Sequence, residues 1–146
     1  MSEAFRISIR IQDNTQKTKE ELETAMERAL YAIGVKGVEG SVDAISGNLG
    51  IDPAVDTGRL RASISFVTPT QKGDSGLSAP SNAKLSDKVS GTAEKNSVVI
   101  GTNVEYAEYV HNGTSRMPGR PFLRKGIDKT KNEMQEQAEK IFKGQL

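Results

Sequence analysis

Two short segments of the chain alternate between apolar and polar residues, as a β-strand with one buried face does. They span residues 5–11 and 62–67. A third segment, residues 97–102, is a run of β-branched residues that ends in Gly-Thr, and it also predicts a strand. Because the last two segments can be joined as a hairpin, we expect them to pair antiparallel.

Three other segments carry apolar residues three or four positions apart, the spacing of an amphipathic helix. They predict a long helix over residues 14–46, a short helix over 104–112 and a last helix over 121–143. Asp13 or Asn14 could accept from the free amides at the start of the long helix and cap it.

Glycines interrupt the apolar pattern of the long helix at Gly34, Gly37 and Gly40. Each glycine in a helix interior costs about 1 kcal/mol relative to alanine. We therefore expect another element to pack against the helix at these positions and to supply the missing stability.

The region between the second and third strands, residues 69–96, has a different composition. It is rich in serine, lysine and glycine, with only scattered apolar residues. Loops of this length are functional or flexible in most compact domains. We expect a long hairpin insertion that is mobile in the isolated subunit and becomes ordered, at least in part, only in the assembly. Alternatively, its lysines line a channel and face passing DNA.

Together these elements predict an α+β fold in one domain, residues 1–146. A small antiparallel sheet packs against a long N-terminal helix and a C-terminal helix, because three short strands would be unstable alone.

Five residues are expected to shape turns. Asp56 fits the N-cap of a single helical turn, and Thr57 and Gly58 suit a tight turn, although these three could instead form a contact surface. Gly113 would close the short helix, and Pro121 suits the first turn of the last helix.

Composition excludes several kinds of chemistry. The 146 residues contain no cysteine and a single histidine, His111, so thiolate metal sites and cysteine nucleophiles are excluded. With no catalytic set of nucleophile and base, we expect no enzyme activity, no cofactor and no metal, and we expect His111 at the surface. No apolar run is long enough for a membrane span, and the first residues do not form a signal peptide, so we expect synthesis in a cytoplasm.

Three motifs together are more specific than any one of them. They are VDTGRLRASI at residues 55–64, VIGTNVEYAEYV at 99–110, and Gly113-Thr114 followed by RPFL at 120–123. In this order they resemble a family of minor structural proteins of long-tailed bacteriophages, tail components that are placed at the head–tail neck. The type member is the tenth gene product of a lambda-like phage, and the resemblance covers residues 14–143.

The chain departs from the family pattern in two places. His111 occupies a position that is often acidic in the family, and residues 69–96 replace what is a shorter turn in many members. Both departures concern local surfaces, so they bear on what those surfaces touch.

The resemblance implies a virion building block that joins head and tail, as a neck, tail-completion or tail-terminator protein. It implies a ring of six copies, with twelve as the second choice, because a tail tube has six-fold symmetry. Neighbouring head-completion and tail-tube or tail-terminator proteins are the implied partners, and genomic DNA would pass through the channel without sequence-specific binding.

Nine residues are candidates for contacts between subunits, because arginine and tyrosine are enriched in interfaces. For the arginines the alternative is a solvated surface, and for the tyrosines it is a core stripe. The candidates are Arg59, Arg61, Tyr106, Tyr109, Arg116, Arg120, Phe122, Arg124 and Lys125.

Charge is distributed unevenly, although the net charge is only +1. Residues 13–47 carry −3 and residues 116–146 carry +4. We expect subunits to pack side by side, with the acidic first helix of one copy near the basic segment 116–131 of the next. The alternatives are two solvated helix faces, or a nucleic-acid-binding accessory factor that uses segment 116–131, although the near-zero net charge argues against the latter.

Overall fold

The structure is a computed structural model, and it has the predicted α+β architecture. It describes residues 3–9, 18–46, 58–70, 89, 92–116 and 118–144. The elements in chain order are β1 (Glu3–Ser8), α1 (Lys19–Ile45), α2 (Gly58–Ser63), β2 (Ser65–Val67), β3 (Ser97–Thr102), α3 (Ala107–Asn112) and α4 (Phe122–Phe142).

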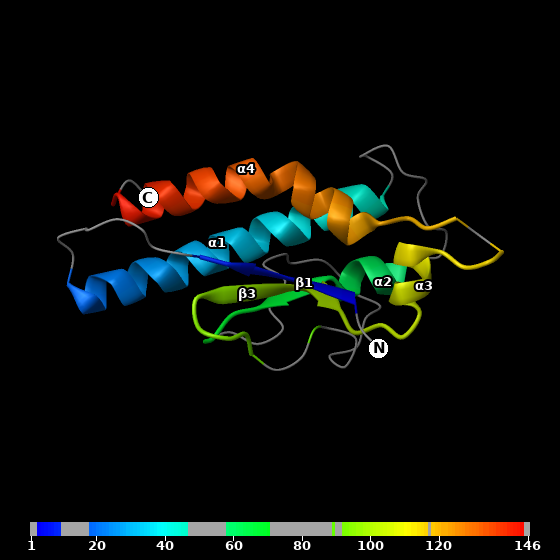
Figure 1. The fold of residues 1–146 in the computed structure, drawn as a ribbon, viewed down its shortest axis with the longest axis horizontal. Coiled ribbons are helices and arrows are strands. Elements are labelled where there is room, and N and C mark those ends of the chain that lie inside the picture. The colour runs from blue at the N-terminus through cyan, green and yellow to red at the C-terminus, as the bar shows by residue number, and fades with distance from the viewer. Residues whose placement is uncertain are drawn as a thin grey trace.

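The strands form one antiparallel sheet in the order β1-β3-β2. Ile100 in β3 is opposite Phe5 on one side and Phe66 on the other, so these three apolar side chains share one face. Figure 1 shows α1 and α4 side by side above this sheet, with α2 and α3 gathered at one end. The predicted antiparallel pairing of the second and third strands is confirmed.

β2 is shorter than predicted, because residues 62 and 63 belong to the helical turn α2. Ser63 donates from Oγ to the carbonyl of Leu60, which favours a turn over a strand at this point. The expected alternation in burial is also wrong, since every residue of β2 is buried. Its outer face is covered near Val89, whose N–H donates to Ser65 Oγ at 2.9 Å.

α1 begins later than predicted and is capped by a different residue. Its N-cap is Thr18, whose hydroxyl accepts from the Glu21 N–H at 3.2 Å. Thr18 therefore has the capping role expected of Asp13 or Asn14, which lie outside the described residues. Glutamates in the first turn complement the positive end of the helix dipole.

Two of the glycines in α1 let the helix lie close to the sheet. A Cβ at Gly34 would lie 2.3 Å from the ring of Phe66, and one at Gly37 would lie 2.2 Å from Cδ1 of Ile100. These bulky side chains occupy the space that a methyl group would need. The sheet thus supplies the packing that the interior glycines were expected to require.

The third glycine sets the distance between α1 and α4. A Cβ on Gly40 would lie 2.4 Å from the carbonyl oxygen of Gly126, and a Cβ on Gly126 would lie 2.3 Å from the Ser41 nitrogen. The backbones of the two helices are therefore in contact. Since residues 25–29 of α1 pack near Ile141, at the other end of α4, the helices run antiparallel.

The short helices at the other end also differ slightly from expectation. α3 is shorter than the predicted 104–112, and Gly113 follows it with φ of 84°, a conformation that favours glycine. Pro121 lies just before α4 rather than in its first turn. Asp56, Thr57 and most of the expected 69–96 loop lie outside the described residues, whereas Gly58 begins α2.

We predict that Gly40→Ala lowers the free energy of unfolding by about 1–3 kcal/mol, because the new methyl group meets backbone that cannot rotate away. Urea denaturation measures this change. Thr24→Ala, at an exposed position of the same helix, is the matched control and should change stability by less than about 0.5 kcal/mol. Equal stability of Gly40→Ala and wild type would contradict the proposed packing.

Candidate functional site

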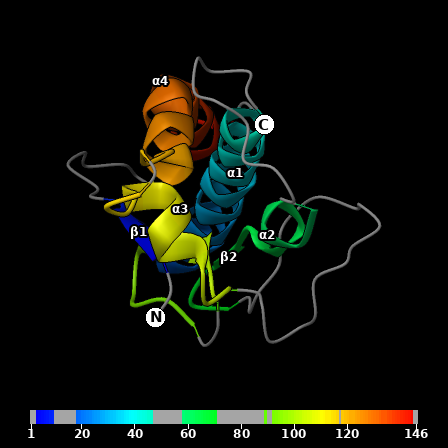
Figure 2. The same ribbon diagram turned by 90° about the vertical axis from the view of Figure 1, so that its right-hand side faces the viewer.

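The end of α3, the connection that follows it and the start of α4 form one corner of the molecule. Figure 2 shows this corner facing the viewer. The connection turns back along α3, because the N–H of Arg120 donates to the carbonyl of Val110 at 2.7 Å. We call α3, residues 113–121 and the first turn of α4 the α3–α4 corner.

His111 lies in the interior of this corner, so the expectation of a surface position is wrong. It is only 2% exposed. Its ring centroid lies 5.9 Å from that of Phe5 and 5.3 Å from that of Phe122, the latter in an edge-on arrangement. His111 therefore joins β1, α3 and α4. The sequence pattern of the short helix could not predict its burial, because the rings that cover it belong to other elements.

The ring nitrogens of His111 connect the corner through polar contacts. Nε2 lies 3.4 Å from the backbone N–H of Arg124, which donates to it. Nε2 is then an acceptor, so the proton of a neutral ring is on Nδ1, which lies 3.0 Å from Asn112 Oδ1 and donates to it. Pro121, the N-cap of α4, makes no side-chain capping bond, and His111 satisfies one of the free amides instead.

The three aromatic candidates differ in their access to a partner. Tyr109 is 56% exposed and Tyr106 is half-buried. Phe122 is completely buried in the core, so its side chain cannot touch another subunit. Within the described residues, Tyr109 is the one large apolar side chain that is exposed.

Three of the four cations of the corner are exposed. Arg116, Arg124 and Lys125 make no side-chain hydrogen bond or ion pair within the described part of the chain. Two of them lie in the first turn of α4, which contains no acidic residue, although a helix N-terminus repels cations. A nearby anion would therefore stabilise this turn.

Arg120 is the most unusual of these cations. It is half-buried, and its Nε is shielded from water without a hydrogen-bond partner. Leaving such a donor unsatisfied costs about 1–3 kcal/mol. The corner thus contains an arginine whose donor is buried in the isolated chain.

Two other arginines that were predicted to contact a second subunit do not belong to the α3–α4 corner. Arg61 donates from Nη1 to Ser46 Oγ at 3.2 Å and so joins α2 to the end of α1. The side chain of Arg59 lies outside the described residues.

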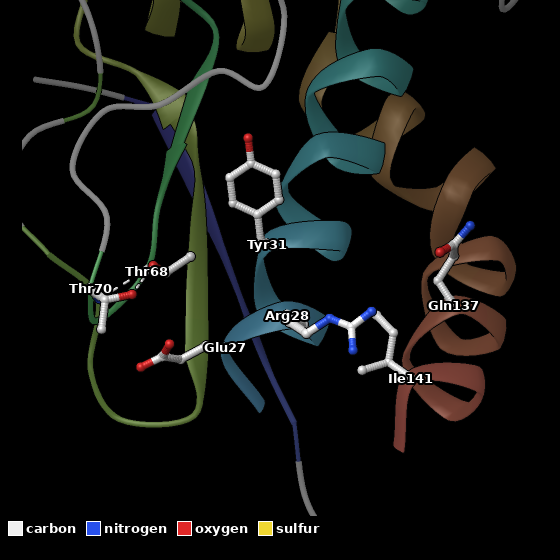
Figure 3. A pocket seen from close by; sticks show the side chains of 7 residues that line it. All are labelled: Glu27, Arg28, Tyr31, Thr68, Thr70, Gln137 and Ile141. Atoms are coloured by element: carbon white, nitrogen blue, oxygen red, sulfur yellow. Dashed lines mark hydrogen bonds between the residues drawn. The ribbon is translucent and has the colours of Figure 1, made fainter. Parts of the chain in front are cut away.

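The opposite end of the molecule has two adjoining hollows beside α1 that sequence reasoning did not find. One has a volume of 510 Å³ and lies over Arg28 and Tyr31. Figure 3 shows Glu27 and Arg28 pointing to opposite sides of the helix there. The other has a volume of 380 Å³ and lies between the first turns of α1 and residues 68–70.

We name the second hollow the α1 groove. Its apolar side chains Leu22, Met26 and Leu30 follow one face of α1, a stripe that the sequence indicated as core. Met26 and Leu30 are buried, but Leu22 is only half-buried, which leaves an apolar floor open to solvent.

The described residues contain neither a cluster of metal ligands nor a membrane-spanning helix. Among them, no group of three or more His, Asp or Glu side chains could hold a metal ion. In the same part of the chain, no helix has the length and apolar character needed to cross a membrane.

We predict that His111→Ala lowers the free energy of unfolding by about 2–3 kcal/mol, because it removes both the ring packing and the acceptor for Arg124. His111→Phe keeps the ring volume and should cost only about 1 kcal/mol. Denaturant unfolding measures both, with Asn132→Ala on the exposed face of α4 as the control. If His111→Ala were as stable as the control, the ring would not join these elements.

Comparison with known proteins gives a family for most of the chain. No curated protein and no solved structure shows significant similarity to the chain. A family model described as "Bacteriophage HK97-gp10, putative tail-component" matches residues 9–113, which include α1, α2, β2, β3 and α3 but neither β1 nor α4. The chain therefore belongs to the HK97-gp10-like family of bacteriophage tail components.

Proposed function

We propose that this chain is the subunit of a ring at the head–tail neck or the proximal end of the tail, where it joins head and tail. Six copies in the ring are favoured, and twelve are the second choice. The role within that region is neck, tail-completion or tail-terminator protein, and the protein acts by assembly rather than by catalysis.

The observation that carries this proposal is the composition of the α3–α4 corner. An exposed tyrosine, Tyr109, lies in the same corner as exposed cations that have no partner among the described residues and as the buried, unsatisfied Nε of Arg120. Tyrosine and arginine are the side chains that dominate protein–protein binding energy. A partner that brings a carboxylate would pair with the exposed cations and cover Tyr109 at the same time.

The proposed neighbours follow from the family. Head-completion proteins would contact one face of the ring, and tail-tube or tail-terminator proteins would contact the other. Genomic DNA would pass through the central channel without sequence-specific binding, in line with a net charge of only +1.

We predict that the purified chain forms closed rings, because head-to-tail contacts between identical subunits give a defined copy number when the rotation between copies closes. Native mass spectrometry and negative-stain imaging measure that number directly, with six expected. Monomers that bind duplex DNA would instead support an accessory factor that uses segment 116–131.

We also predict that the double variant Arg124→Glu, Lys125→Glu weakens the oligomer, since it reverses the charge of the corner. Exposed ion pairs contribute about 0–1 kcal/mol each, so the shift should be modest and should decrease at high salt. Light scattering during size exclusion measures it.

The matched control is Lys140→Glu, Lys143→Glu, which makes the same change in net charge at the other end of α4. Equal assembly of the two double variants at every salt concentration would rule out an electrostatic role of the corner.

A further inference from the structure

We propose that Tyr109 of one copy inserts into the α1 groove of a second copy, so that each subunit contributes two different surfaces to a head-to-tail contact. This inference rests on the proposed self-assembly and names the partner surface of the α3–α4 corner. The occupant of the groove is thus a side chain of this same protein.

The groove has the size and lining that an aromatic side chain requires. Its volume is 380 Å³, and Met26 and Leu30, 7% and 1% exposed, form its floor. Leu22 and Pro69 form apolar parts of its wall. Burial of a tyrosine covers about 150–250 Å² of surface, and its hydroxyl can remain at the polar rim.

Tyr109 cannot reach the groove of its own subunit. Gly126, one turn into α4, is in contact with Gly40 of α1, so the corner lies level with that part of α1. Leu22 precedes Gly40 by 18 residues, which corresponds to about 27 Å along the helix. Figure 1 accordingly shows the start of α1 and the α3–α4 corner at opposite ends of the molecule.

Charge around the two surfaces favours the same pairing. Glu23 and Glu27 line the groove, and the exposed Glu20 and Glu21 lie on the preceding turn. None of these four carboxylates has an ion-pair partner within the described residues. They can face the corner cations of the next copy, including the guanidinium of Arg120.

Cations also occur at the groove. Lys19 and Lys95 line its other margin, so the local charge is mixed rather than purely acidic. The aromatic contact must therefore supply most of the affinity, whereas the charges select the orientation in which Glu23 and Glu27, rather than the lysines, meet the corner.

The contact is heterologous, because the α3–α4 corner with Tyr109 and the α1 groove are different surfaces at opposite ends of the subunit. Such contacts build a ring when the rotation between copies closes, and a filament when it does not. A two-fold contact of corner against corner would instead bring like charges together.

The test places the photo-reactive amino acid benzoylphenylalanine at position 109 of the full-length chain. After irradiation, mass spectrometry should locate cross-links on residues 19–30, 68–70 or 95–96 of a second copy. Cross-links from position 109 to residues 107–125 of a second copy, or to any other surface, overturn the inference.

Two variants test the same contact from both sides. Tyr109→Ala should raise the concentration at half-assembly by about 30-fold, the effect of losing a hot-spot side chain. Leu22→Arg, which puts a cation into the groove, should have a similar effect. Thr24→Arg is the control, because this exposed residue lies on the opposite face of the same turn of α1.

The outcomes separate this inference from the proposed function. Rings that persist in Tyr109→Ala and Leu22→Arg, with circular dichroism confirming the fold, would leave the ring standing and refute this contact. A wild-type chain that stays monomeric at every concentration would refute both.

Discussion

The backbone contact between α1 and α4 determines where everything else in this structure lies. Gly40 and Gly126 allow the two helices to touch, and neither position has space for a methyl group. Thr130 of α4 also lies at this contact, because a Cβ on Gly40 would be 2.8 Å from its Cγ2, and its hydroxyl donates to the carbonyl of Gly126 within α4. Because the contact lies one turn into α4, it fixes the start of that helix, and with it the α3–α4 corner, level with the last turns of α1.

The sequence predicted the elements well because their periodicities are strong, but it could not predict which residues would meet. The alternation in residues 5–11 predicted the strand, and the spacing of Met26, Leu30 and Ile33 predicted the helix. The glycines of α1 were correctly interpreted as places that need a packing partner. The partner at Gly40 is another glycine 86 positions later, and no local pattern connects two residues that have no side chains.

The candidate site, like the fold, could be predicted in its residue types but not in how its residues pack. Residue type alone indicated Tyr109 and the cations of segment 116–131, and the structure places the tyrosine and the first cations in one corner. Phe122 and His111 could not be assigned from type, because each packs against a ring from another element. Phe5 of β1 covers His111 from a distance of more than 100 positions in the sequence, and His111 packs against Phe122. The α1 groove was not predicted, because an apolar stripe on a helix indicates core packing along its whole length. The pattern does not show that Leu22, at one end of the stripe, is left partly uncovered.

The first turns of the two long helices carry charges of opposite sign. In α1 the glutamates of the first turn agree with the helix dipole, whereas the first turn of α4 has Arg124 and Lys125 where the dipole disfavours cations. Among the described residues, the ion pair between these helices joins Lys36 of α1 to Glu133 of α4 at 3.7 Å. Its cation is on α1 and its anion on α4, so it does not involve the corner cations. Positions where a chain breaks a local rule without internal compensation are where function is expected. The cations of α4 are such a position, and they lie beside the tyrosine and the unsatisfied arginine that a second subunit would cover.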